Sequence, residues 1–238
     1  MAIIYKSERE SEFYSDNTVI FADGTKGKYK GIFVDGKPEG LLKVYYENGK
    51  LKSEAIYKNG QKEGTAKDYY ESGELHLEYI FQDGKEEGLF KIYDENGKIS
   101  QEGNYKGEKL EGILKHYYSN GKLHGKRNYE NGEREGLARD YYESGELRSE
   151  EIYRDGQKEG RWKTYYKNGK LKSKVTYKNG KQEGFMKDYY ENGKLKSKAT
   201  YKNGKLEGLW ITYFENGKII QKSIFKNGKL LGILKTYY

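Results

Sequence analysis

The sequence of 238 residues contains no cysteine, which excludes disulfide bonds, thiolate metal sites and a cysteine nucleophile. It also lacks any apolar run long enough to span a bilayer, and its apolar start, MAIIYKS, is too short for the hydrophobic region of a signal peptide. We therefore expect a cytoplasmic protein, or an exported or cell-surface one if a signal peptide has been removed.

Hydrophobic residues are scarce, at 34%, the same fraction as charged residues. Disordered chains share this polarity but are poor in aromatic residues, whereas aromatics here reach 15%, with 26 tyrosines. The composition therefore indicates an ordered structure with a thin core. The formal charge of +8 comes from 45 basic and 37 acidic residues that are interleaved, which favours solubility and a weak attraction to anionic partners.

Glycine recurs every 24 residues, and such a period indicates a repeat architecture. One series lies at residues 40, 64, 88, 112, 136, 160, 184, 208 and 232. A second lies at residues 49, 73, 97, 121, 145, 169, 193 and 217. The third lies at residues 36, 60, 84, 132, 156, 180, 204 and 228, and is interrupted where Glu108 replaces glycine.

Each repeat carries two turn dipeptides, Asn-Gly or Ser-Gly first and Asn-Gly or Asp-Gly second. Asn-Gly and Asp-Gly supply the positive φ values of a type I′ hairpin turn. The segments between the turns are 9 and 11 residues long and rich in Tyr, Leu, Ile and Thr, which is typical of strands. The sequence predicts an all-β, solenoid-like fold: a single antiparallel β-meander of 24-residue hairpin repeats, extended along one axis.

The repeats suggest three parts. Residues 1–15 fit no register and are expected to form an N-terminal cap, as terminal repeats of solenoids often do. Residues 16–39 are a degenerate first repeat, and residues 40–238 contain eight full repeats and a final half repeat. The last strand would have an unpaired edge, so we expect it to be able to pair with another chain.

Strand alternation assigns two faces if both turns have two-residue loops. Tyr46 would then lie opposite Leu51, and Tyr57 opposite Gly40. The expected core face also holds one apolar side chain per repeat, at Leu42, Phe90, Leu114, Trp162, Met186, Trp210 and Leu234.

The opposite face carries an aromatic residue that never changes, at Tyr45, Tyr69, Tyr93, Tyr117, Tyr141, Tyr165, Tyr189, Tyr213 and Tyr237. Two residues earlier stands a basic residue in eight of nine repeats, which faces a glutamate in pairs such as Lys43–Glu54. In later repeats lysine takes the place of that glutamate. Two interpretations are open. In the first, the tyrosines shield backbone hydrogen bonds and the lysines keep the sheet soluble, which is a structural role only. In the second, this face is a groove that binds an anionic or aromatic-rich partner. If this face binds a partner, the expected contact residues are Lys163, Tyr165, Lys174, Lys187, Tyr189, Lys198 and Tyr213.

The repeat unit, as in YYENGKLKSEAIYKNGQKEG at residues 45–64, resembles the bacterial variant of the MORN (membrane occupation and recognition nexus) repeat, MORN-2 type. It is most similar to the branch labelled as antitoxins, and the resemblance covers residues 16–238. The resemblance implies an elongated, curved sheet of hairpins and a binding or scaffolding role. Departures are the degenerate first repeats, the displaced glycine in NYKGEKLEG, and Asp94 in place of the second tyrosine.

No catalytic constellation is indicated, because a repeat presents like groups at regular intervals rather than unlike groups at one place. The three histidines are irregularly placed and predict no metal site, and no glycine-rich phosphate loop is present. The glutamate before each glycine of the first series is interpreted as a solvated turn residue. Interleaved glutamates also make nucleic acid an unfavoured partner.

We therefore expect a non-enzymatic protein without cofactors that binds another macromolecule. The first hypothesis is a protein partner, with a toxin-neutralising antitoxin or immunity role. The alternative is a membrane-peripheral or cell-surface scaffold that binds anionic lipid headgroups or glycans.

Overall fold

The computed structural model describes residues 3–6 and 11–236, and all regular structure within these residues is β-strand. The chain forms two compact units, Met1–Gly121 and Lys122–Tyr238, which are treated separately below. Parts of the expected cap (residues 1–2 and 7–10) and Tyr237 lie outside the described residues.

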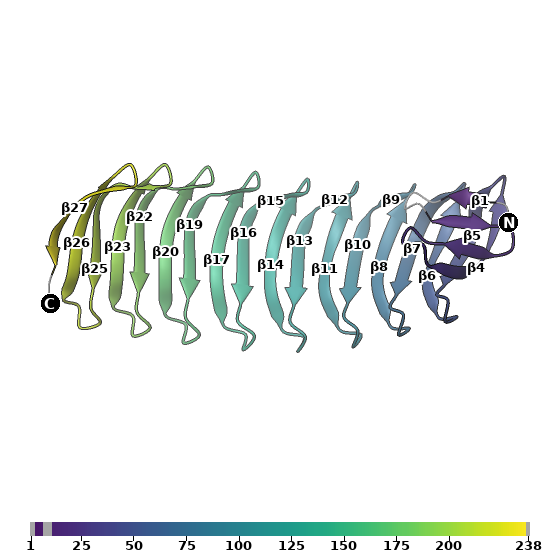
Figure 1. Cartoon of the computed structure of the whole chain (residues 1–238), viewed down its shortest axis with the longest axis horizontal. Coiled ribbons are helices and arrows are strands. Elements are labelled where there is room, and N and C mark those ends of the chain that lie inside the picture. The colour runs from purple at the N-terminus through teal and green to yellow at the C-terminus, as the bar shows by residue number, and fades with distance from the viewer. Residues whose placement is uncertain (1–2, 7–10, 237–238) are drawn as a thin grey trace. The chain divides into compact units, whose positions relative to one another are not determined.

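In the first unit, successive strands lie beside one another in antiparallel pairs (Figure 1). Its strands are β1 (Ile3–Lys6), β2 (Glu12–Tyr14), β3 (Thr18–Ile20), β4 (Lys26–Val34), β5 (Lys37–Tyr45), β6 (Leu51–Lys58), β7 (Gln61–Tyr69), β8 (Leu75–Gln82), β9 (Lys85–Glu86), β10 (Gly88–Tyr93), β11 (Ile99–Lys106), β12 (Lys109–Leu110) and β13 (Gly112–Tyr117).

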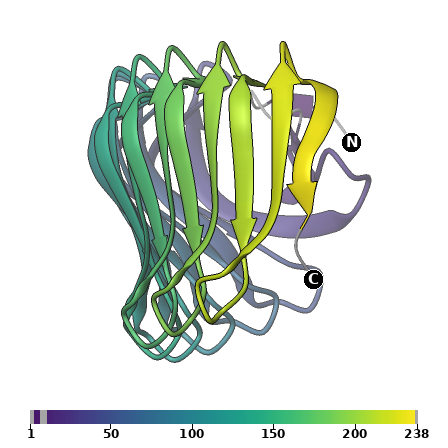
Figure 2. The same ribbon diagram turned by 90° about the vertical axis from the view of Figure 1, so that its left-hand side faces the viewer.

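The second unit continues the same hairpin pattern, and Figure 2 shows its final strands side by side in alternating directions. Its strands are β14 (Leu123–Glu130), β15 (Glu133–Arg134), β16 (Gly136–Tyr141), β17 (Leu147–Arg154), β18 (Gln157–Lys158), β19 (Gly160–Tyr165), β20 (Leu171–Lys178), β21 (Lys181–Gln182), β22 (Gly184–Tyr189), β23 (Leu195–Lys202), β24 (Lys205–Leu206), β25 (Gly208–Tyr213), β26 (Ile219–Lys226) and β27 (Lys229–Thr236). The prediction of an all-β antiparallel meander of hairpin repeats is confirmed.

The second turn of each repeat has the predicted type I′ geometry. Asn59 and Gly60 have φ values of 52° and 83°, and Lys58 pairs directly with Gln61 across the two-residue loop. A type I′ turn needs positive φ at both central residues, which Asn tolerates and Gly adopts freely.

The prediction of a two-residue loop at the first turn is wrong. The Gly49 N–H donates to the Tyr46 carbonyl at 2.9 Å and the Tyr46 N–H to the Lys50 carbonyl at 2.8 Å, so Tyr46 belongs to the turn. Leu51 therefore pairs with Tyr45 rather than with Tyr46. The register is restored by a bulge, and the expected pairs Lys43–Glu54 and Gly40–Tyr57 form nonetheless. Register in a hairpin follows from the loop length, which Asn-Gly alone did not determine.

The glutamate of each Glu-Gly dipeptide joins neighbouring repeats. Glu39 accepts a hydrogen bond from the Asn59 N–H at 2.8 Å, which lies in the type I′ turn of the next hairpin. The same contact recurs for Glu63, Glu87, Glu135, Glu159, Glu183 and Glu207. These side chains are therefore turn-binding acceptors rather than merely solvated residues. The following glycine has positive φ, as at Gly64 (69°), because it lies in a β-bulge.

The expected core face is only partly buried. Leu42, Phe90 and Leu114 are buried as predicted. Trp210 and Leu234 are exposed, which contradicts their assignment to the core. Leu234 lies on β27, which pairs with β26 alone among the described strands. Trp210 is opposite the small Ser223 and contacts the Phe225 ring at 5.9 Å between centroids, which leaves part of the indole exposed.

The N-terminal strands close over this face of the first unit. Phe13, Val19 and Tyr29 pack with Leu42 and Val44 in one buried cluster. The aromatic rings of Phe13 and Tyr29 meet edge to face at 5.3 Å between centroids. This cluster is the most apolar core in the described residues of the first unit, because the hairpins themselves bury mostly small or single apolar side chains.

Candidate functional site

The face that carries Lys43 and its equivalents differs between the two units in how its charges are paired. In the first unit, the Lys43 ammonium lies 3.1 Å from the Glu54 carboxylate, and the Tyr69 hydroxyl donates to the same carboxylate at 2.9 Å. Lys115 and Tyr117 bind Glu102 in the same way, at 2.8 and 2.7 Å. A glutamate thus joins a lysine and the unvarying tyrosine.

These contacts shift the pKa values of the groups that form them. The hydrogen bonds from Lys115 and Tyr117 outweigh burial and lower the pKa of Glu102. Burial, together with the hydrogen bond to Glu54, raises the pKa of Tyr69 to about 12. Glu102 is therefore charged and Tyr69 neutral over the physiological pH range.

The second unit begins with the same arrangement. Glu150 pairs with Arg139 at 3.0 Å and with Lys163 at 3.8 Å, and it accepts a hydrogen bond from the Tyr165 hydroxyl at 3.0 Å. Tyr165, one of the predicted contact residues, is therefore already engaged within the sheet, and burial with this hydrogen bond raises its pKa.

The pairing ends at the next strand, where Lys174 replaces the glutamate. Lys163 lies opposite Lys174, Lys174 opposite Lys187, and Lys187 opposite Lys198, on the adjacent strands β19, β20, β22 and β23. We call these four residues the lysine row. Within residues 3–6 and 11–236, the ammonium groups of Lys174, Lys187 and Lys198 form no ion pair.

Neighbouring strands lie about 4.8 Å apart, so the row places like charges directly across from one another, which destabilises a sheet. Lys174 and Lys198 are exposed, and Lys163 and Lys187 are half-buried. The row is therefore a surface concentration of positive charge that an anionic partner would neutralise.

Tyr189 and Tyr213, the remaining predicted contact residues, end strands β22 and β25 on the same face. In the described part of the chain their hydroxyls make no hydrogen bond, because lysine stands where Tyr69 and Tyr165 find a glutamate. Their backbone carbonyls accept hydrogen bonds from the Tyr166 and Tyr190 hydroxyls, at 2.8 and 2.6 Å. Tyr46, Tyr70 and Tyr142 make the same contact, so where the second tyrosine is present in these repeats it fixes the position of the first tyrosine of the next.

Sequence reasoning missed a line of exposed apolar side chains on this face. Phe185 is 71% exposed and lies two residues before Lys187 on β22. Leu209 is 46% exposed and lies two residues before Ile211, which holds the repeat position of Lys187 on β25. Leu137 and Ile152, which pair across β16 and β17, are also exposed. Counting two residues back from Arg139 and Lys187 would have found Leu137 and Phe185, since alternate residues of a strand share a face.

The charge of the chain is divided unequally between the units. Residues 1–121 hold 18 lysines and arginines against 22 aspartates and glutamates, whereas residues 122–238 hold 27 against 15. The lysine row therefore belongs to a strongly basic unit, and the first unit is acidic.

The histidines and carboxylates form no metal site in the described ranges: no group of three or more could hold an ion. His76 stacks on Tyr70, with ring centroids 4.2 Å apart. No helix long and apolar enough to cross a membrane is found in residues 3–6 and 11–236.

A family model described as MORN repeat variant matches most of the chain. It matches residues 38–59, 62–83, 86–106, 110–131, 134–155, 158–179, 182–203 and 206–227. The chain belongs to the MORN repeat variant family. Within this MORN repeat variant protein, the lysine row occupies the two matched repeats 158–179 and 182–203. The matched segments begin 24 residues apart, as the glycine series predicts.

Other comparisons add little to the family assignment. No curated protein matches the chain. It is similar to a chain in the crystal structure of TcdB2-TccC3-Cdc42, with 11% identity and a TM-score of 0.21 over 90% of this chain and 11% of that chain. It is also similar to a chain of the Photorhabdus luminescens Tc holotoxin pore, with 12% identity and a TM-score of 0.17 over 90% of this chain and 12% of that one. The chain spans about a tenth of these solved chains, and similarities this slight inform neither fold nor function.

Proposed function

We propose that this MORN repeat variant protein is a non-enzymatic binding protein whose partner is an acidic protein surface, held on the lysine row. The observation that carries the proposal is the row itself: Lys174, Lys187 and Lys198 lie side by side, and none of them has an ion pair with a carboxylate in the described residues. The equivalent positions of the first unit keep their glutamates, so the repeat can stabilise itself without such a row.

The surroundings of the row support a protein partner. Phe185 and Leu209 expose apolar surface beside the lysines, and protein interfaces combine apolar contacts with complementary charge. The hydroxyls of Tyr189 and Tyr213 add donors at the strand ends, in keeping with the enrichment of tyrosine at interfaces. A phosphate backbone would use the lysines but not the exposed apolar side chains.

In its most specific form the proposal is that the partner is a toxin, which the chain neutralises as an antitoxin or immunity protein. The similarity of the repeats to the antitoxin-labelled branch motivates this form. Growth of cells that express a toxin encoded beside this gene, with and without the chain, tests it. Rescue by the parent protein supports neutralisation, and an absence of rescue with every neighbouring candidate contradicts it.

The double variant Lys174→Glu/Lys198→Glu tests the binding face. Each new glutamate would stand opposite Lys187, as Glu54 stands opposite Lys43, so we expect the variant to fold and to be at least as stable as the parent. It should lose the partner that the parent retains in a pull-down from the source organism. The matched control is Lys172→Glu/Lys196→Glu, which changes the charge equally but alters lysines over the rings of Tyr166 and Tyr190. Equal recovery of the partner by parent and double variant would contradict the proposal.

A membrane-peripheral or cell-surface scaffold that binds lipid headgroups or glycans is the alternative, because lysines beside exposed apolar residues also suit an anionic membrane surface. Sedimentation with vesicles that contain phosphatidylserine distinguishes the two. Salt-sensitive binding to these vesicles, lost in the double variant and without a protein partner, would favour the alternative.

A further inference from the structure

The first unit contains a concave pocket of about 770 Å³ between its N-terminal strands and the face of β5–β8. Pockets for small molecules lie in the range of about 300–1,000 Å³. Phe21 and Asp23 line one side, and Tyr57 and Phe81 line another. The pocket belongs to the first unit and the lysine row to the second, so the pocket is independent of the proposed function.

The pocket is open because two alanines lie at its floor. Ala55 pairs directly with Ala66 across β6 and β7, and both are buried. The repeats on either side place Leu42 and Phe90 at the position of Ala66. Small residues here leave space beside the half-buried Tyr57 ring, while Phe81 packs with the two alanines and is buried.

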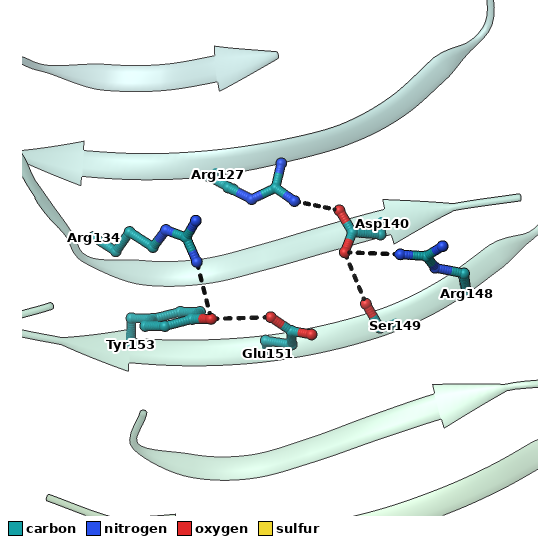
Figure 3. Close-up of polar contacts among 7 residues, drawn as sticks. All are labelled: Arg127, Arg134, Asp140, Arg148, Ser149, Glu151 and Tyr153. Carbon is teal, nitrogen blue, oxygen red and sulfur yellow. Dashed lines mark hydrogen bonds and ion pairs between the residues drawn. The ribbon is translucent and has the colours of Figure 1, made fainter. Parts of the chain in front are cut away.

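Asp68 lines this pocket near Lys52, and its negative charge acts on the Lys52 ammonium. The aspartates at the same repeat position in the second unit, Asp140 and Asp188, accept hydrogen bonds from neighbouring side chains. Asp140 accepts from Arg127 at 2.9 Å and from Ser149 at 3.3 Å, and lies 3.7 Å from Arg148 (Figure 3).

Asp188 is likewise satisfied, by the hydroxyls of Ser173 and Ser197 at 2.8 Å each. Asp68 is half-buried, yet its carboxylate makes no hydrogen bond or ion pair within residues 3–6 and 11–236. Leu77 stands where Asp188 has Ser197, which removes one donor. A half-buried carboxylate without a donor is a ready acceptor for a ligand cation.

The aromatic walls already hold ammonium groups of the chain itself. The Lys52 ammonium lies 3.3 Å from the centre of the Phe21 ring, and the Lys62 ammonium lies 4.8 Å from that of Phe81. Ring faces attract cations, most strongly where water is excluded. The walls thus have the chemistry of a cation site, with room left beyond the two lysines.

Two more carboxylates line the other end of the pocket. Glu86 occupies the repeat position at which Lys62, Arg134 and Lys158 place a cation over an aromatic ring. Glu108 occupies the second position of a type I′ turn with φ of 64°, where the other repeats have glycine. Neither carboxylate has a hydrogen bond or ion pair in the described part of the chain.

The two acidic ends are separated along β8. Asp68 pairs with Leu77, and Glu86 pairs with Phe81, four residues further on. At about 3.4 Å per residue this is about 14 Å of strand. An apolar stretch of Tyr57, Phe81 and the two alanines lies between them.

We propose that this pocket binds a linear polyamine, with one ammonium group at Asp68, another at Glu86 and Glu108, and the hydrocarbon chain over the Tyr57 ring. The acidic excess of the first unit favours such a cation, although the chain as a whole is basic. A free polyamine and a lysine-rich peptide share this chemistry.

Isothermal titration with spermidine tests the site, with an acetylated trilysine amide as the peptide probe. We expect saturable 1:1 binding of spermidine and weaker binding of putrescine, whose shorter chain cannot bridge both ends. Tighter binding of the peptide would assign the site to a lysine-rich segment; tighter binding of spermidine would assign it to the free amine.

Two variants probe the pocket without threatening the fold. Asp68→Asn removes only an unpaired charge and should weaken spermidine binding at least about tenfold, the effect of losing one charge-assisted hydrogen bond. Ala66→Leu fills the floor with the residue found at the equivalent Leu42 and should abolish binding with an unchanged melting temperature.

Asp188→Asn, in the other unit, is the control and should bind spermidine as the parent does. Absence of saturable binding by the parent, or binding that neither Asp68→Asn nor Ala66→Leu weakens, would overturn the proposal. Loss of a protein partner in the lysine-row variant would leave these results unaffected.

Discussion

Adjacent tyrosines of one repeat have different roles, although the sequence presents them as a plain pair. The Tyr165 hydroxyl binds Glu150 of the preceding hairpin, whereas the Tyr166 hydroxyl binds the carbonyl of Tyr189 in the following one. The repeat that holds Tyr165 and Tyr166 is thereby tied to both neighbours by polar contacts in addition to the strand hydrogen bonds. These tyrosines compensate for a core that is thin between the hairpins.

Glu102 is the residue at which this linkage depends most clearly on pH. Its pKa is lowered in the folded state by hydrogen bonds from Lys115 and Tyr117, so it stabilises the fold above its unfolded pKa of about 4.3. That stabilisation is lost as the pH falls through the lowered folded pKa. We expect Glu102→Gln to lower the melting temperature at pH 6, and to lower it less near pH 3.

Thermal unfolding followed by circular dichroism at both pH values measures this difference. Glu95→Gln, in an exposed turn, serves as the control and should leave the curves unchanged. A deficit of the Glu102→Gln variant that is as large at pH 3 as at pH 6 would contradict an electrostatic role for this carboxylate.

The turns and bulges set the register of each hairpin at the scale of the element. The sequence predicted the type I′ turn at Asn59-Gly60 because both residue types tolerate positive φ. It did not predict the longer turn at Tyr46–Gly49, since Asn-Gly there has only its glycine in the left-handed region. The dipeptide is the same in both places. The longer turn also forms at Asp94–Gly97 and Phe214–Gly217, so the hydroxyl of the Tyr46 position does not set the loop length.

In the turn at Gly107-Glu108 glycine comes first, whereas in the other type I′ turns it comes second. Glu108 therefore has positive φ at the position that glycine holds elsewhere. A left-handed conformation costs a residue other than glycine about 1–2 kcal/mol. Replacing Glu108 with glycine removes this cost, but part of the gain is offset because glycine loses more conformational entropy on folding. We expect Glu108→Gly to raise the free energy of unfolding by about 0.5–1 kcal/mol, measured by urea denaturation.

The matched substitution is Glu130→Gly, in the exposed last position of β14, which should destabilise because glycine weakens a strand. A stability of Glu108→Gly equal to or below that of the parent would show that this turn holds no strain.

Charge distribution is the feature that distinguishes the two units at the scale of the molecule. The second unit has 27 basic and 15 acidic residues, and its lysine row stacks like charges on neighbouring strands. Such repulsion destabilises the folded state and is screened by salt. This part of the chain therefore retains a cost in stability that the first unit avoids with Glu54 and Glu102.

We expect the melting temperature of the parent to rise when the salt concentration is increased from about 20 mM to about 300 mM, because the Debye length falls below the extent of the row. The melting temperature of the Lys174→Glu/Lys198→Glu variant should rise less with salt, since positive and negative charges would alternate along its row. Differential scanning calorimetry at the two salt concentrations measures both gains, and equal gains would contradict a repulsive row.

The sequence by itself determined the 24-residue period, the strand pairing and the pairing of Lys43 with Glu54, because these follow from local turn chemistry and from alternation along a strand. It also placed the lysine row correctly on one face. The tertiary structure decided the contacts that join one repeat to the next, such as Glu39 on the following turn and the Tyr46 hydroxyl on the carbonyl of Tyr69, and it decided the pocket beside Asp68. These depend on how side chains about 20 residues apart meet after the hairpins have paired, which local patterns do not encode.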